Sequence, residues 1–185
     1  MARSNFDGLR QLQEQMEALA DPNTQKQFYE GCLKESAARF LGKVIRKTPV
    51  GNNLYVDEDA GNGRSRQVVA RQGGTLRRGW TARTEAEAES GSNKNPTQYA
   101  NSLTVERTNR NYSITITNPV HYASFVESGH RQQVGRFVPA IGKRLKKSWV
   151  EGQFFMAKSE AEIKAEIPAI LERRLKRFLQ NGGNR

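Results

Sequence analysis

Residues 121–131 read HYASFVESGHR, and this stretch decides the fold because it can be taken as a reactive cluster or as a packing helix. Tyr122, Phe125 and Val126 follow an i, i+3, i+4 spacing, which places them on one face of a helix. Gly129 is the kind of residue at which a helix ends. The spacing predicts a short packing helix over Tyr122, Phe125 and Val126, with Glu127 and Gly129 shaping the turn after it.

The polar residues of this stretch do not match the spacing of a known reactive centre. A helical zinc site requires histidines at i and i+4 and a third ligand, whereas Gly129 and a predicted helix end separate His121 from His130. Ser124 and Ser128 lack the G-x-S-x-G elbow. A weak site of two histidines and a carboxylate, or a triad assembled from distant residues, is left open. We expect no enzymatic activity, no cofactor and no metal site.

Strand patterns precede this helix. The segments SLTVER (102–107) and YSITIT (112–117) alternate apolar and polar residues, and TNRN between them is a plausible hairpin turn. The segment RGWTARTEAEAE (78–89) alternates more weakly and is predicted as a strand with a charged outer face. Together these segments predict a small antiparallel sheet.

A strongly basic segment follows the helix. Residues 111–150 carry six basic side chains against Glu127 alone, a net charge of +5. Four of the six are spaced to lie around one side of a helical turn, with Leu145 and Trp149 on a roughly opposite stripe. Such a run is usually a solvated face, but it can also meet DNA or an acidic protein surface. The candidate contact residues are Arg131, Arg136, Lys143, Arg144, Lys146 and Lys147.

Two long helices are predicted around the sheet. Residues 24–47 have a wide apolar face that includes Cys32, which we expect to be buried and inert. Residues 159–179 have a second apolar face, with Ser159 and Glu162 as a capping box. Trp80 and Trp149 are expected to be core residues or interface anchors.

The N-terminal residues 4–20 show a narrow apolar stripe that contains Leu9, Leu12 and Met16. Their helix either lies on its own domain or forms an arm that packs on a neighbouring subunit. We therefore predict an arm over 1–20, one α+β domain over 21–180 and a frayed tail over 181–185. Long loops are expected at 51–75, with room for a short hairpin around Val68–Val69, and at 86–98.

The composition limits the class of protein. The chain has 185 residues, 36% of them hydrophobic, and a mean hydropathy of −0.78, so its core is modest. Thirty Lys and Arg residues against 19 acidic residues give a net charge of +11, which favours polyanionic partners. One cysteine excludes an intrachain disulfide. We expect no signal peptide and no membrane span.

The order of motifs resembles a phage family found at the head–tail joint of long-tailed phages, variously called tail-component, neck, head–tail connector or tail-completion proteins. Its features include a helix ending near TPVDTG, an LRRS-like step, YAxxVExG and a later proline segment. The resemblance covers about residues 8–179, and the longer C-terminal end is similar to versions from contractile-tailed phages. The aspartate and threonine after TPV are missing here, and about two dozen residues are inserted before LRRGW. The matching positions are Thr48-Pro49-Val50, Leu76–Trp80, Tyr122-Ala123, Val126-Glu127, Gly129 and Pro139-Ala140.

The resemblance implies a structural virion protein of the neck, assembled in the host cytoplasm. Such a protein forms a homo-oligomeric ring, with a hexamer as the expected form, between neighbouring neck, connector and tail-terminator proteins. It surrounds the DNA passage and can contact packaged DNA without reading its sequence. The alternative is a free basic nucleic-acid-binding protein that uses residues 131–147, although no DNA-reading module is recognisable.

Overall fold

The computed structural model describes residues 17, 21–59, 61, 64–91, 94–109, 111–138 and 142–180. Three kinds of predicted feature lie outside the described residues: the arm stripe of Leu9, Leu12 and Met16, the motif residue Pro139, and the tail 181–185.

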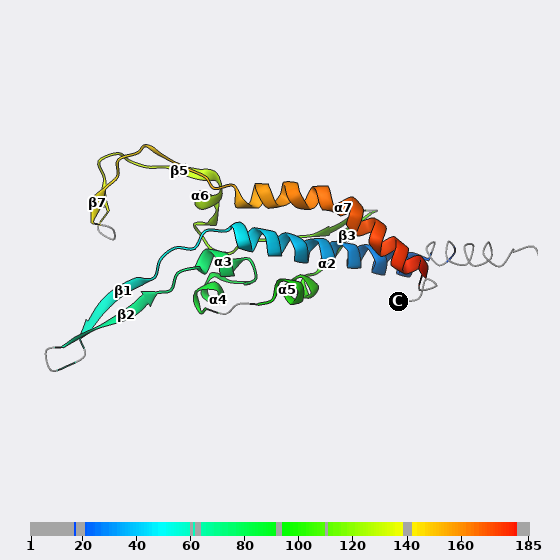
Figure 1. Cartoon of the computed structure of the whole chain (residues 1–185), viewed down its shortest axis with the longest axis horizontal. Helices are drawn as coiled ribbons and strands as arrows, with labels where there is room; N and C mark the ends of the chain where they lie inside the picture. The colour runs from blue at the N-terminus through cyan, green and yellow to red at the C-terminus, as the bar shows by residue number, and fades with distance from the viewer. Residues whose placement is uncertain are drawn as a thin grey trace, which may run out of the picture. The chain divides into compact units, whose positions relative to one another are not determined.

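The chain divides into two compact units, and the residues predicted as one domain fall in both. The first unit contains residues 1–39, 97–115 and 162–185, and the second contains residues 40–96 and 116–161. The two long helices that Figure 1 labels, α2 (Pro22–Lys47) and α7 (Phe155–Gln180), each have residues in both units. The fold is a mixture of helices and small antiparallel sheets, as the sequence predicts.

Helix α2 confirms the prediction for residues 24–47. The Asp21 carboxylate accepts a 2.7 Å hydrogen bond from the backbone N–H of Thr24, which satisfies one of the unpaired donors of the first turn. Pro22 follows at the first helical position, where its missing N–H costs nothing. The apolar face is buried and includes Cys32, as predicted.

In the first unit, α2 packs on β4 through aromatic side chains. The predicted hairpin is confirmed as β3 (Val105–Thr108) paired with β4 (Asn111–Ile114). The Tyr29 ring stacks on the Tyr112 ring of β4, with centroids 5.1 Å apart. Helix α5 (Pro96–Ser102) precedes β3 and buries Tyr99 and Ala100.

Among the described residues, the second unit contains three short helices and three strand pairs, besides parts of α2 and α7. The helices are α3 (Thr75–Gly79), α4 (Glu85–Glu89) and α6 (Ala123–Ser128). The antiparallel pairs are β1 (Leu54–Asp59) with β2 (Ser65–Arg71), β5 (Gly129–Arg131) with β8 (Trp149–Glu151), and β6 (Phe137–Val138) with β7 (Lys143–Arg144). The described strands thus pair two by two, rather than in one sheet.

Trp80 forms the centre of the second unit's core, because its side chain is only 2% exposed. Its ring lies edge-on to the rings of Phe40 and Phe155, with centroids 6.2 and 6.1 Å away. Its indole N–H donates a 2.8 Å hydrogen bond to the hydroxyl of Thr48, which is fully buried. The guanidinium of Arg77 donates to the Thr48 carbonyl, with the shorter bond at 2.8 Å. These contacts join the end of α2 to α3.

The predicted strand over 78–89 is wrong, because this segment contains the end of α3 and all of α4. The hydroxyl of Thr84 accepts a hydrogen bond from the backbone N–H of Glu87 at 3.2 Å. The Glu87 carboxylate reaches back to the backbone N–H of Arg83 at 2.7 Å. This reciprocal capping stabilises a helix start, and it outweighs the alternation of Ala and Glu.

The predicted capping box at Ser159 is also wrong. Helix α7 begins earlier, at Phe155, and the buried Ser159 hydroxyl donates to the Phe155 carbonyl inside the helix. Pro168 lies within this helix. The segment predicted as a long loop at 51–75 contains the β1–β2 hairpin, and the loop predicted at 86–98 includes parts of α4 and α5.

Candidate functional site

The short helix predicted from HYASFVESGHR is confirmed as α6, with Gly129 directly after it at a φ of 82°. Tyr122 and Val126 are half-buried, as expected for packing residues. The expectation that Phe125 packs beneath the helix is wrong, because its side chain is 54% exposed. The Phe125 ring lies instead 5.7 Å from the ring of His130 in β5.

Glu127 caps helix α7 from a different element. Its two carboxylate oxygens accept hydrogen bonds from the backbone N–H groups of Met156 at 2.9 Å and Ala157 at 3.0 Å. The first N–H groups of a helix have no partner within the helix, and a negative charge there is favourable. The glutamate predicted to shape a turn therefore fixes where the last helix begins.

Two glycines let the backbones on either side of this cap approach closely. A Cβ on Gly129 would overlap the carbonyl oxygen of Val150, and a Cβ on Gly152 would overlap the carbonyl oxygen of Glu127. The backbone N–H of Gln153 also donates to the Val126 carbonyl at 2.9 Å. We call Glu127, Gly129 and Gly152 the α6–α7 clamp.

The two histidines have different neighbours. His121 is exposed and its Nδ1 lies 2.6 Å from a carboxylate oxygen of Glu85. His130 lies in β5, with its Nε2 3.4 Å from the side-chain nitrogen of Gln132. Within the described parts of the chain, no three His, Cys, Asp or Glu side chains converge in a way that could hold a metal ion.

The basic segment forms a long two-stranded ribbon, so the predicted helical turn over 143–147 is wrong. Lys143 and Arg144 form β7, opposite β6. Backbone hydrogen bonds continue the pairing toward β5 and β8, among them Gly135 N to Leu145 O at 2.9 Å and Gln132 N to Ser148 O at 2.8 Å. Gly135 and Gly142 have φ values of 83° and 62°, which a helix does not allow. We call residues 129–138 and 142–151 the basic ribbon.

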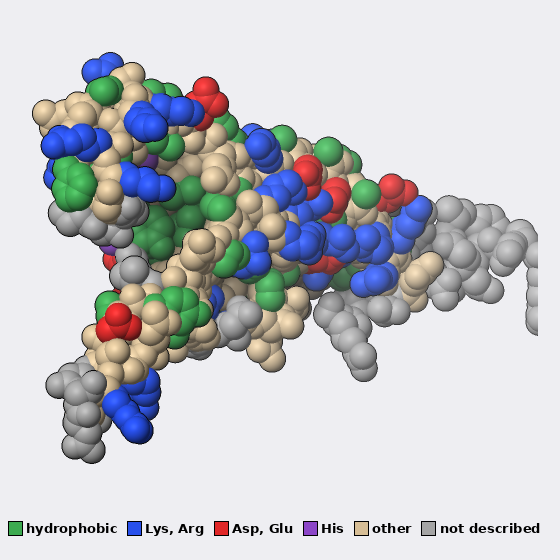
Figure 2. All heavy atoms as spheres, turned by 60° about the vertical axis from the view of Figure 1, so that its left-hand side comes forward, with side chains coloured by type: hydrophobic (Ala, Val, Ile, Leu, Met, Phe, Trp, Pro, Cys, Tyr) green, Lys and Arg blue, Asp and Glu red, His purple; other side chains and the backbone are tan. Residues whose placement is uncertain are grey.

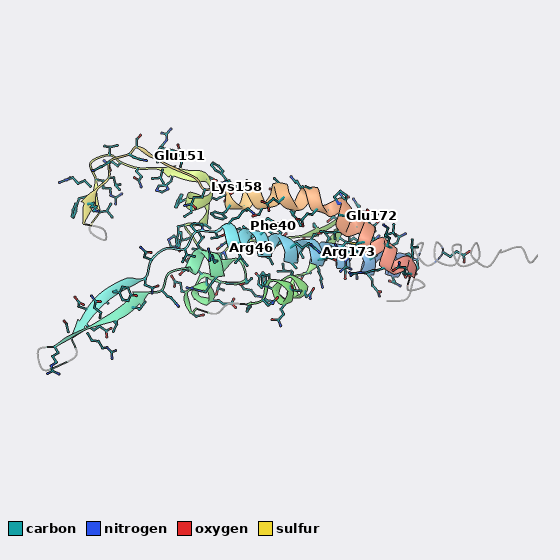
Figure 3. The ribbon with its side chains drawn as sticks, viewed as in Figure 1. Phe40, Arg46, Glu151, Lys158, Glu172 and Arg173 are labelled. Carbon is teal, nitrogen blue, oxygen red and sulfur yellow. The ribbon has the colours of Figure 1, made fainter. Side chains whose placement is uncertain are left out.

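All six predicted contact residues lie exposed on the basic ribbon, and at the upper left of Figure 2 Lys and Arg side chains gather beside hydrophobic ones. Phe137 is 50% exposed and Trp149 is 46% exposed, so Trp149 is not a core residue. A groove in the ribbon is lined by Val134, Lys146, Lys147, Ser148 and Trp149, and also by Glu151 at the end of β8, which Figure 3 labels. The six residues are Arg131, Arg136, Lys143, Arg144, Lys146 and Lys147.

The β1–β2 hairpin is a second exposed ribbon. Tyr55 is 54% exposed and Val56 is 42% exposed, although neighbouring residues of a strand point to opposite faces. Both faces of the hairpin are therefore accessible. A hairpin with no third strand or covering helix is at best marginally stable in water. Neither LYVDED nor SRQVVAR alternates apolar and polar residues, so the sequence predicted only the short hairpin expected around Val68–Val69.

A carboxylate ringed by three arginines was not visible in the sequence. Glu35 of α2 accepts a hydrogen bond from Arg39 at 3.1 Å, from Arg174 of α7 at 2.8 Å, and a further short one from Arg173, which Figure 3 labels. Burial raises the pKa of Glu35, but the hydrogen bonds from Arg174, Arg173 and Arg39 together lower it below its ordinary value. The cluster joins α2 to α7 within the first unit.

This lowered pKa predicts a loss of stability in acid. The folded state binds the Glu35 proton less readily than the unfolded chain does, so the cluster's contribution is complete above the ordinary pKa of 4.5. It is lost as the pH falls through the lower, folded-state pKa. We expect Glu35→Gln to lower stability near neutral pH and to flatten the dependence on pH below 4.5.

The measurement is urea unfolding followed by far-ultraviolet circular dichroism between pH 3 and pH 7, where carboxylates change charge. Glu172→Gln is the matched control, because Glu172 also pairs with a cation on α7 but its side chain is 65% exposed. That change should affect stability far less than Glu35→Gln, because solvent screens an exposed ion pair. Equal effects of the two variants would contradict a special role for Glu35.

Comparison with known proteins gives one family. A model of the HK97-gp10-like family, described as "Bacteriophage HK97-gp10, putative tail-component", matches residues 10–129. No curated protein and no solved structure matches the chain. Within the described residues, no helix is long and apolar enough to cross a lipid bilayer. The matched region contains Thr48, Trp80 and the Glu127 and Gly129 of the α6–α7 clamp, and it ends where the basic ribbon begins. The chain therefore belongs to the HK97-gp10-like family of bacteriophage tail components.

Proposed function

We propose that this chain is a non-enzymatic structural subunit of the phage neck, where copies of it form a ring that joins the DNA-filled head to the tail. Membership of a tail-component family supports a place in the virion. The observation that carries the ring is the exposure of apolar side chains on two thin ribbons. These side chains are Tyr55, Val56, Val69, Val134, Phe137 and Trp149.

Such exposure is unfavourable in an isolated subunit. Each square ångström of apolar surface removed from water contributes roughly 25 cal/mol, and large exposed apolar patches usually mark interaction sites. A two-stranded ribbon gains little from its own chain, because two strands alone bury little apolar surface. A ring supplies a neighbour for every copy, so each ribbon can be covered by the next subunit.

The ring would surround the path of the genome and contact neighbouring neck, connector and tail-terminator proteins. Six exposed basic residues on the basic ribbon support contact with a polyanion, either packaged DNA or an acidic protein surface. Contact with DNA would be through phosphates, because a moving genome presents every sequence in turn. We propose that the ring contains six subunits.

The proposal predicts a specific defect when the protein is removed. We expect a lysate of a phage that lacks this chain to contain DNA-filled heads and separate tails, because each assembles on its own but the joint is missing. Electron microscopy of the lysate measures the fraction of joined particles. Supplying the wild-type chain from a plasmid is the control and should restore joined particles. Normal particles without the chain would refute the proposal.

The rival function is a free basic protein that binds nucleic acid, and the same six basic residues favour it. Light scattering of the purified chain at low and high salt separates the two functions. A neck subunit should self-associate or be found in purified virions. A free DNA binder should stay small, be absent from virions, and lose affinity for DNA steeply as salt rises.

A further inference from the structure

One face of the β1–β2 hairpin combines apolar side chains with negative charge. The register pairs Tyr55 with Val69 and Asp57 with Gln67, so these four side chains share a face. Tyr55 and Val69 are about half exposed, and Asp57 is exposed. Arg66 and Glu58, which pair with each other, lie on the other face. We call Tyr55, Asp57, Gln67 and Val69 the hairpin face.

The groove of the basic ribbon combines apolar side chains with positive charge, which complements the negative charge of the hairpin face. Val134 is 59% exposed and Trp149 is 46% exposed, and together they give the groove its apolar surface. Lys146 and Lys147 line the same groove and are exposed. The ion pairs found among the described residues include neither these lysines nor Asp57. The charges on both surfaces are therefore available to a partner.

We propose that the hairpin face of one copy docks in the basic-ribbon groove of the next copy. Asp57 then lies against Lys146 and Lys147, while Tyr55 and Val69 cover Val134 and Trp149. The contact joins two different patches, so it is heterologous and generates a ring when the rotation between copies closes. The inference rests on the proposed ring and names the surfaces that hold it together.

A second copy explains the groove better than DNA does. Duplex DNA presents a dense row of phosphates, which would pair with Lys146 and Lys147 but leave Val134 and Trp149 in contact with water. The hairpin face offers both a carboxylate and apolar side chains. Tyrosine and tryptophan are also the side chains that most often dominate the binding energy of protein interfaces.

Cysteine cross-linking tests the contact directly. Gln67 lies on the hairpin face and Ser148 lines the groove, and both are exposed. We expect the double variant Gln67→Cys with Ser148→Cys to give, after mild oxidation, a ladder of linked oligomers on a non-reducing gel. Each single variant should give no ladder, because one cysteine per copy cannot link more than two chains. Cys32 is buried and should not contribute.

Charge reversal gives a second, independent test. Asp57→Lys alone, or Lys146→Glu with Lys147→Glu, should lower the infectious titre by about 100-fold or more, since opposed like charges cost several kcal/mol. Combining all three changes should restore the titre to within about tenfold, because the attraction returns with reversed sign. Glu58→Lys is the matched control, because Glu58 is the next residue of the same strand but points to the other face. Circular dichroism checks that each variant is folded.

The outcomes separate this contact from the ring itself. Rings that form without a cross-linked ladder, and that tolerate Asp57→Lys, would overturn the docking and leave the proposed function intact. A wild-type chain that neither self-associates nor enters virions would overturn both. Joined particles that leak DNA when Lys146 and Lys147 are reversed would show that the groove faces the genome, and would also overturn the docking.

Discussion

Replacing Trp80 with alanine lowers the free energy of unfolding by about 3–5 kcal/mol, the range for removing a large buried aromatic side chain. The substitution removes the ring contacts with Phe40 and Phe155 and leaves a cavity at the centre of the second unit. It also leaves the buried Thr48 hydroxyl without the indole N–H that it accepts at 2.8 Å. The hydroxyl keeps the 2.7 Å hydrogen bond that it donates to the Val44 carbonyl, so the added cost is that of one lost hydrogen bond.

Trp149→Ala is the control, because Trp149 is 46% exposed on the basic ribbon. We expect it to change the stability of the isolated subunit by no more than about 0.5–1 kcal/mol, while it weakens assembly. Urea unfolding measures the stability of the two variants. It is followed by far-ultraviolet circular dichroism, because each substitution itself changes the tryptophan fluorescence. Equal losses for the two variants would show that Trp80 does not anchor the core.

Gly129→Ala is expected to be the second most damaging change. At a φ of 82° and a ψ of 171°, the backbone lies in a region that is essentially reserved for glycine, and forcing another residue there costs about 1–3 kcal/mol. The new methyl group would also overlap the Val150 carbonyl oxygen. Relieving that overlap would separate the two backbones of the α6–α7 clamp and displace Glu127 from the N-terminus of α7.

Gly135→Ala is the control for the overlap. Gly135 has nearly the same φ, 83°, but among the described residues no atom outside its chain neighbours lies within 4 Å of the position that its Cβ would occupy. We expect Gly135→Ala to cost only the backbone strain, and Gly129→Ala to cost clearly more. Thermal unfolding of both variants measures the difference. If Gly129→Ala is no worse than Gly135→Ala, the clamp does not depend on close contact between the backbones.

The elements that the sequence predicted well are those whose signals are local. Helix α2 has a long apolar face and a proline soon after its end, and α6 is bounded by the glycine at 129. The hairpin of β3 and β4 follows from two alternating segments on either side of a short turn. Pattern and turn chemistry agree in these places, which is why the prediction held.

The errors arose where a partner distant in the sequence decides the structure. The α7 start is fixed by Glu127, which lies 29 positions before the backbone N–H that it caps, so a local search chose Ser159 instead. The spacing of Lys143, Arg144, Lys146 and Lys147 fits a helical turn, but pairing across the basic ribbon sets their conformation. The cluster around Glu35 joins residues 139 positions apart. No local pattern contains such pairs.

The candidate site, too, could be predicted from the sequence only in part. The six basic residues were predicted as an exposed surface from their charge alone, and the structure places all six at the surface. Charge could not show that an apolar groove with Trp149 runs beside them, because exposure of a tryptophan runs against its usual burial. The acidic and apolar hairpin face was hidden in a segment that reads as a glycine-rich loop.

The α6–α7 clamp has a mechanical consequence for the basic ribbon. Residues 129–138 of the ribbon leave the clamp at Gly129, and residues 142–151 return to it at Gly152. Both segments are therefore held at the same place. The base of the ribbon is therefore held on both sides, and it passes strain from the ribbon to the first turn of α7, whose N–H groups Glu127 caps.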